Sequence, residues 1–176
     1  MKKELLIEIE ATAGELLQAI NAFSHEEINM VPFEGSWTPG QVSEHLIKAA
    51  AGIARTVNGN TKPTERDPAQ NVAGLRSAFL DFSKKMKSPD FILPGDAPQQ
   101  KEKLLEGAAD AMAKISTATD TLDLTETCID FELPNSGQLT RLEWINFIIC
   151  HTKRHIHQLK TIRGKMKLLA NQNINN

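Results

Sequence analysis

Apolar side chains recur at helical spacing in four long segments of the chain. In the first segment, from about residue 3 to 23, Leu, Ile and Ala recur at steps of three and four, with glutamates on the other faces. Similar periods occur at about 39–58, 98–119 and 141–164. The pattern therefore predicts four amphipathic helices that bury their apolar faces against one another.

Two of these helices begin at recognisable capping signals. Thr38 precedes Pro39 and is followed three residues later by Gln41, and Thr140 and Glu143 have the same spacing. We expect the second helix to end near residues 58–60, Asn-Gly-Asn, and the last helix to end near Gly164. The tail NQNINN should be frayed.

The stretch from residue 61 to 98 is interrupted by five prolines, which bracket one short helix near residues 71–87. We interpret it as a long crossover connection. Residues 125–137, TETCIDFELPNSG, alternate weakly and fit either an extended loop or a short strand. The prediction is a single all-α domain, residues 1–176, built as a four-helix bundle with one long crossover.

Composition excludes few functions, because the 20 basic and 22 acidic residues give a net charge of −2. This balance favours neither nucleic acid nor an anionic membrane as a partner. The chain shows no signal peptide and no apolar run of transmembrane length, so we expect a cytoplasmic protein. Basic residues do gather in the last helix, where they either complement the helix dipole as a solvated face or form a nucleic-acid patch; we favour the solvated face.

The segment HTKRHIH, residues 151–157, carries the strongest chemical signal. His151 and His155 are four residues apart, so on a helix they lie within about 40° of each other and can chelate one ion. His157 is about 200° from His155 and should face elsewhere. Because Thr152 follows His151, the glutamate base of the HExxH metalloprotease motif is missing, which disfavours peptidase chemistry.

A third imidazole can join this pair from the second predicted helix. His45 lies there on the inward side, together with Val42, Leu46 and Ala49. Three neutral histidines suit zinc, nickel, copper or ferrous iron better than magnesium or calcium, and they leave a coordination position open for water or substrate. The alternative is a hydrogen-bonded polar cluster without a metal.

Four nearby residues are weaker candidates for the site. Trp37 can form a pocket wall or anchor the core, and Trp144 fits core packing. Glu44 and Cys150 each neighbour a histidine in sequence but point about 100° away from it, so we expect neither to bind the metal. Cys150 and Cys128 form no CxxC pair, and we expect Cys150 to be a structural thiol.

The two motifs WTPGQVSEHL, residues 37–46, and HTKRHIHQL, residues 151–159, resemble those of the DinB/YfiT-like superfamily of metal-dependent enzymes. The resemblance implies a four-helix bundle in which His45, His151 and His155 bind one divalent ion. It also implies a homodimer. Relatives such as bacillithiol transferases and mycothiol-dependent maleylpyruvate isomerase imply that a low-molecular-weight thiol is a partner.

We therefore predict a metal-dependent enzyme, an S-transferase or hydrolase that acts on a small electrophile, with zinc, nickel or iron as cofactor. No catalytic residue beyond the three metal ligands can be named from the sequence. The alternative function is a non-catalytic metal-binding or stress-related interaction protein. We expect no nucleic acid and no membrane among its partners.

Overall fold

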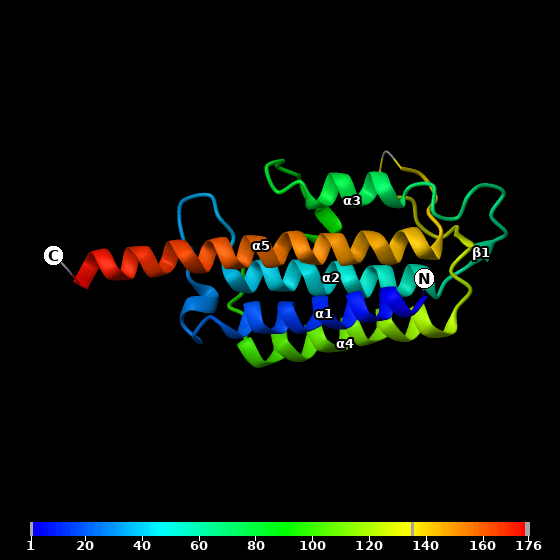
Figure 1. Ribbon diagram of the computed structural model, residues 1–176. Coiled ribbons are helices and arrows are strands. Elements are labelled where there is room, and N and C mark those ends of the chain that lie inside the picture. The colour runs from blue at the N-terminus through cyan, green and yellow to red at the C-terminus, as the bar shows by residue number, and fades with distance from the viewer. Residues whose placement is uncertain (1, 135, 175–176) are drawn as a thin grey trace.

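A computed structural model describes residues 2–134 and 136–174, and its order of elements confirms the predicted all-α fold (Figure 1). The long helices are α1 (Lys2–Asn21), α2 (Pro39–Val57), α4 (Lys101–Thr121) and α5 (Arg141–Ile174). The remaining elements are η1 (Glu27–Asn29), β1 (Thr61–Lys62), α3 (Val72–Leu80), η2 (Asp90–Ile92) and β2 (Thr127–Cys128).

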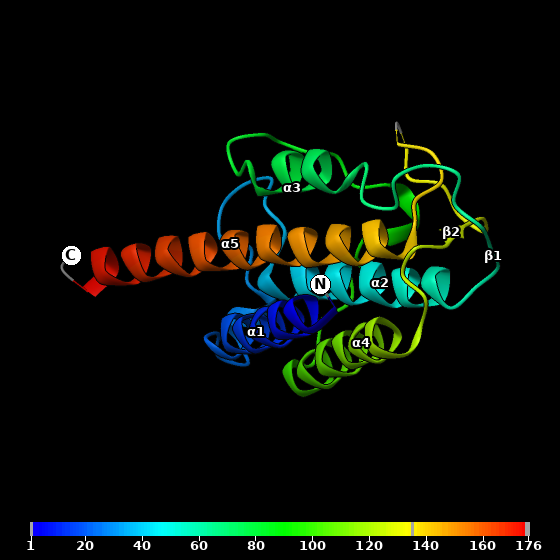
Figure 2. The ribbon, with the colours of Figure 1, turned by 45° about the vertical axis from the view of Figure 1, so that its right-hand side comes forward.

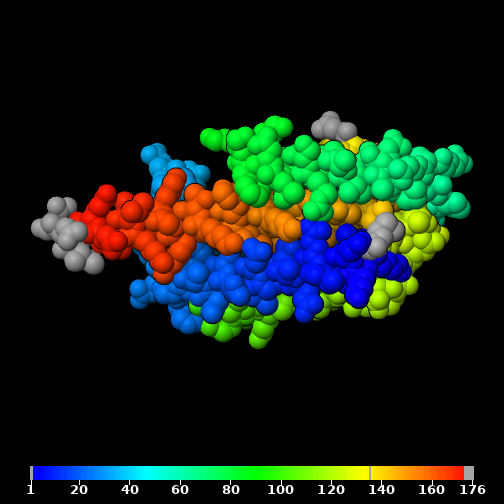
Figure 3. Space-filling view, in the orientation of Figure 1, coloured from blue at the N-terminus to red at the C-terminus, as the bar shows by residue number. Residues whose placement is uncertain are grey.

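The four long helices form the bundle, and α3 packs on the outside of α5 (Figure 2). Helices α2 and α4 run in the same direction, opposite to α1 and α5 (Figure 1). Consistent with this, Lys101 at the start of α4 donates to Phe23 O just beyond α1, at 2.8 Å. The parallel α2 and α4 require the long crossover that the sequence predicts, and α3 lies within it. In the space-filling view the green and blue-green part of the crossover lies along one side of the orange α5 (Figure 3).

The core is formed by the apolar faces that the periodicity predicts. Ile20, Ile115, Ile148 and Leu159 are each fully buried, one or two from each of three bundle helices. At the start of α2 the backbone comes close to η1: a Cβ added to Gly40 would lie 2.8 Å from Ile28 O. Glycine is required at this position because a side chain would collide with the backbone of η1. The contact places the start of α2 against η1.

Both predicted capping boxes are present. Thr38 Oγ1 accepts from Gln41 N and Gln41 Oε1 accepts from Thr38 N, each at 3.0 Å. Thr140 Oγ1 accepts from Glu143 N at 3.2 Å, and Glu143 Oε2 accepts from Thr140 N at 2.9 Å. The caps set the starting positions of α2 and α5, the two helices that carry the histidines.

The prediction that the last helix ends near Gly164 was wrong. Helix α5 continues to Ile174, because Gly164 keeps a helical conformation and the next residues, Lys-Met-Lys-Leu-Leu-Ala, are good helix formers. The expected fraying also fails for residues 171–174, which are helical; residues 175 and 176 lie outside the described residues. The end of α5 projects beyond the bundle (Figure 1).

The crossover helix is shorter than predicted, since α3 ends at Leu80 rather than near residue 87. Asp81 ends it by accepting hydrogen bonds on Oδ1 from Ser83 N at 3.2 Å and from Ser83 Oγ at 2.5 Å. This local turn replaces the next turn of helix. Arg154 then holds the segment against α5 by donating to the carbonyls of Phe79, Asp81 and Lys84.

Residues 125–137 contain a short strand as well as loop. Strand β2 pairs antiparallel with β1, with Thr61 opposite Cys128 and Lys62 opposite Thr127. The pairing ties the start of the crossover to the segment that leads into α5. Across residues 2–134 and 136–174, no helix is both long and apolar enough to span a bilayer.

Candidate metal centre

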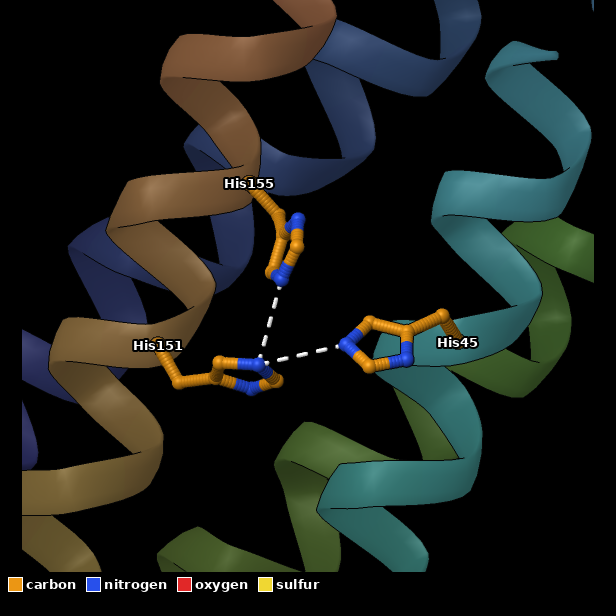
Figure 4. A group of neighbouring side chains, drawn as sticks. All are labelled: His45, His151 and His155. Atoms are coloured by element: carbon orange, nitrogen blue, oxygen red, sulfur yellow. Dashed lines mark hydrogen bonds between the residues drawn. The ribbon is translucent and has the colours of Figure 1, made fainter. Parts of the chain in front are cut away.

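The structure brings His45 of α2 together with His151 and His155 of α5 (Figure 4). His151 Nε2 lies 3.2 Å from His45 Nε2 and 3.1 Å from His155 Nε2. The ligand atoms of all three residues lie within 4.8 Å of one another. The three side chains are at most 9% exposed, so the nitrogens meet inside the protein.

This arrangement fits a first-row divalent metal. Zinc–imidazole bonds of about 2.0–2.1 Å at tetrahedral angles place neighbouring nitrogens about 3.3 Å apart, and two of the three pairs are within about 0.2 Å of that value. Only imidazole nitrogens converge, which suits zinc, nickel, copper or iron rather than the oxygen-seeking magnesium or calcium. The three residues can therefore hold such an ion.

Two neighbours orient the outer imidazoles. His45 Nδ1 donates to the carbonyl of Ile92, at 3.0 Å, because a carbonyl can only accept. This proton leaves the lone pair on His45 Nε2, facing the cluster. His155 Nδ1 lies 2.7 Å from Gln158 Oε1, which orients that ring in the same way. Sequence reasoning missed both partners: a backbone carbonyl leaves no sequence signal, whereas the i, i+3 spacing could have indicated Gln158.

On the side of the ring that faces away from the cluster, packing orients His151. Its Nδ1 is buried and has no hydrogen-bond partner among the described residues. Its ring stacks on Phe147, with centroids 5.5 Å apart and planes 10° apart. Phe79 contacts the same imidazole edge-on at a centroid distance of 6.0 Å. The position of this ligand thus depends on two aromatic rings.

The three imidazoles are poised in the form that binds metal. Burial lowers the pKa of each from the ordinary value of 6.5: that of His155 falls to about 4, and that of His151 lies well below 6.5. The pKa of His45 is also lowered by burial, partly opposed by its bond to Ile92. All three are therefore neutral near pH 7, so a metal does not have to compete with a second proton on each ring.

The neighbouring residues lie as the helix geometry predicts. His157 is exposed and stacks on Phe82 with centroids 4.4 Å apart, away from the cluster. Glu44 pairs with Lys48 at 2.9 Å instead of facing the site. Cys150 is a buried free thiol whose pKa is raised by desolvation, as expected for a structural cysteine.

The basic face of α5 is solvated as predicted at Lys160, Lys165 and Lys167, but several of its cations also form ion pairs. Lys153 pairs with Glu8 at 2.5 Å, Lys160 pairs with Glu15 at 3.1 Å, and Arg163 pairs with Glu27. These cations join α5 to α1 and η1, so they support the bundle. The surface offers less free positive charge to nucleic acid than the sequence suggests.

The histidine cluster opens into a cleft of about 1770 Å³ between α2, α3, α5 and the segment around residues 82–93. Trp37 forms part of its wall, with its ring centroid 5.2 Å from that of His45. Of the nine aromatic residues in the chain, seven Phe and two Trp, all but Phe23 line this cleft. Aromatic side chains are thus concentrated around the candidate metal centre.

An all-α bundle in which two facing helices bring three neutral imidazoles to the wall of an aromatic cleft defines a class of candidate metal-binding proteins. The chain belongs to the DinB superfamily, whose sequence model matches residues 8–159. This match includes all three histidines and confirms the resemblance drawn from the two motifs.

The chain is also similar to the Uncharacterized protein YuaE of Bacillus subtilis (strain 168). The two are 27% identical over 161 residues, which cover 87% of this chain and 93% of that protein. The name of that relative assigns no activity to it. No solved structure matches the chain significantly.

Proposed function

We propose that this protein is a metal-dependent enzyme that joins a low-molecular-weight thiol, or water, to a small electrophile. The observation that carries the proposal is the convergence of three neutral imidazole nitrogens at the wall of a large cleft. Three protein ligands leave a coordination position for a substrate, which is the arrangement of a catalytic rather than a structural site. When bound, a zinc-like ion would supply Lewis acidity that lowers the pKa of a thiol or water.

The residues of the chain would hold and shield this centre. His45, His151 and His155 bind, while Ile92 O and Gln158 keep two of the rings in the orientation that faces the cluster. Trp37, Phe79 and Phe147 surround the imidazoles and limit the access of water. A water-poor surrounding strengthens the electrostatic interactions of a reacting group.

The acid–base groups of the cleft favour a thiol over water as the nucleophile. Among the described lining residues the only carboxylate is Asp130, and it already accepts from Asn60 N at 2.7 Å and Asn60 Nδ2 at 3.0 Å. No free carboxylate of the lining is thus available as a general base. A thiol, with a pKa of about 8–9, loses its proton far more easily than water does and therefore needs such a base less.

The first test is metal content. We expect untagged protein purified without chelator, then reconstituted with zinc, nickel or ferrous iron, to hold about one equivalent by elemental analysis. The double variant His45→Ala/His151→Ala should hold none while keeping its helical circular dichroism. The matched control is His25→Ala/His157→Ala, which removes two exposed histidines outside the cluster and should keep the metal. Equal metal content in both variants would refute the site.

Activity is then assayed on metal-loaded protein with a panel of thiols and small electrophiles. Thiol consumption that is lost in the His45→Ala/His151→Ala variant and kept in His25→Ala, which changes an exposed histidine outside the cleft lining, would support the proposal. Stoichiometric metal with no turnover across the panel would favour the alternative, a non-catalytic metal-binding protein.

A further inference from the structure

The lining of the cleft carries an excess of positive charge that the chain as a whole lacks. Six basic residues line it, against the single acid Asp130: Lys48, Arg55, Lys84, Lys85, Lys87 and Arg154. In the full sequence acidic residues outnumber basic ones, 22 to 20. A cleft lined by one sign of charge concentrates small ions of the opposite sign. The cleft therefore attracts anions.

Three of these cations are committed to the protein itself. Lys48 pairs with Glu44, Lys84 pairs with Asp81, and Arg154 donates to three backbone carbonyls. The other three, Arg55, Lys85 and Lys87, are exposed and make no hydrogen bond or ion pair within the described part of the chain. These three unpaired cations are available to a ligand.

Arg55 is placed to act along the cleft. Its Nη2 lies 3.9 Å from the point that a Cβ on Gly52 would occupy, so the guanidinium folds back over α2 toward His45. Gly52 and His45 both line the cleft and are seven residues apart, which is about 10 Å along a helix. The guanidinium, which lies near Gly52, is thus separated from the histidine cluster by about the length of a small molecule, roughly 10 Å along the helix.

Part of the wall of the same cleft is aromatic. Phe131 contacts Phe91 at a centroid distance of 5.7 Å and Trp144 at 5.7 Å, and all three line the cleft. The indole Nε1 of Trp144 is buried and has no acceptor among the described residues. This part of the wall therefore offers aromatic faces, and the unpaired cations of the cleft offer only donors. A ligand that brings acceptors and a flat apolar body would match it.

We propose that the substrate class of this cleft is a small aromatic anion, anchored by Arg55 and attracted by Lys85 and Lys87. The inference rests on the proposed function and deepens it. It assigns one of the two reactants, the electrophile or the thiol, a negative charge about 10 Å from the metal ligands. The planar guanidinium suits a carboxylate or phosphate because it can donate two parallel hydrogen bonds. The aromatic wall holds the rest of the molecule.

The test compares 4-phenylbutyrate with its neutral amide, 4-phenylbutanamide, as probes of the cleft. Both tryptophans of the chain line the cleft, so their fluorescence reports binding directly, with calorimetry as a second readout. We expect the acid to bind at least about tenfold more tightly than the amide, since a hydrogen bond to a charged group is worth about that factor or more. Equal affinities, or no binding of either probe, would overturn the proposal.

Variants then assign the preference to Arg55. Arg55→Glu should abolish the preference for the acid, and Arg55→Lys should keep part of it. Lys103→Glu, an equal charge reversal at an exposed position of α4 outside the cleft, is the control and should keep it in full. The double variant Lys85→Glu/Lys87→Glu provides an independent test should Arg55→Glu fail to fold. It should also weaken the binding of 4-phenylbutyrate. A preference that survives both reversals would overturn the proposal.

Measurements on metal-free protein separate this inference from the proposed function. The preference for the acid should persist without metal, because the cations that cause it belong to the protein. If the preference occurs only in metal-loaded protein and is unchanged in the Arg55 variants, the metal itself binds the carboxylate. That result would refute Arg55 as the anchor. Failure of metal binding would leave the preference measurable, and failure of the preference would leave the metal content unchanged.

Discussion

Gln158 orients one ligand of the candidate metal centre through a single hydrogen bond of 2.7 Å to His155 Nδ1. We expect Gln158→Leu to weaken zinc binding by about 10- to 100-fold, since loss of such a partner frees the ring and lowers its basicity. Competition with a chromophoric chelator measures the change. Gln18→Leu, an exposed glutamine of α1, is the control, and equal affinities for the two variants would contradict the orienting role.

Glu143 is a buried carboxylate with four hydrogen-bond donors around it. Burial alone raises its pKa, but the hydrogen bonds from Arg66, Thr140 N and Asn71 N outweigh burial, and the net pKa is lowered from 4.5. Its two carboxylate oxygens lie 2.6 and 2.7 Å from the Arg66 guanidinium. The ionised carboxylate thus holds the crossover against the start of α5.

We expect Glu143→Gln to lower the free energy of unfolding by about 2–3 kcal/mol at pH 7, because the charge-assisted bonds are lost. A lowered folded-state pKa means that this stabilisation is complete above about pH 4.5 and is lost as the pH falls through the folded-state value. Urea unfolding at pH 7 and in steps below pH 4.5 should show the difference between variant and wild type shrinking. Glu10→Gln, at an exposed site, is the control; a gap that grows toward acid would contradict the assignment.

The residues of the candidate site could be predicted well where a single helix determines their geometry. The i, i+4 spacing of His151 and His155 requires a shared face, and the inward position of His45 placed it toward the core, where the structure finds it. Partners that come from irregular segments could not be predicted. Ile92 O acts through its backbone, and any residue at that position would have offered the same carbonyl.

At the scale of elements, Gly164 lies inside α5, and a Cβ there would meet nothing within 4 Å. We expect Gly164→Ala to stabilise the protein by about 0.5–1 kcal/mol, because alanine loses less backbone entropy in a helix. Thermal or urea unfolding measures it. Gly40→Ala is the matched comparison with the opposite expectation. Its Cβ would lie 2.8 Å from Ile28 O, so this variant should destabilise the protein. Destabilisation by Gly164→Ala would mean that the helix does not pass through this residue.

Helix starts were more predictable than helix ends. Threonine caps with Gln41 and Glu143 act within four residues, so the sequence contains the whole interaction. The ends of α3 and α5 depend on wider context. Asp81 ends α3 through a turn with Ser83, and Arg154, far along the chain, binds the carbonyls near that end. Glycine ends a helix only when it leaves the helical conformation, which Gly164 does not.

At the scale of the whole molecule, the order of the helices and the long crossover followed from the periodicity and the prolines. The pairing of β1 with β2 did not, because two-residue strands leave almost no pattern. The cleft was also beyond prediction, since it is formed by α2, α3, α5 and the crossover together. Its aromatic and cationic lining comes from segments that are scattered along the chain, and only their packing makes it one surface.

The candidate metal ligands His45 and His151 are 106 residues apart in the chain. Contacts of such long sequence separation are costly to form, whereas His151 and His155 are only four residues apart. A metal bound across α2 and α5 therefore stabilises a contact that is expected to form after the transition state for folding. Its effect would fall on the unfolding rate rather than the folding rate, so occupancy would lengthen the lifetime of the folded protein without helping the chain to fold.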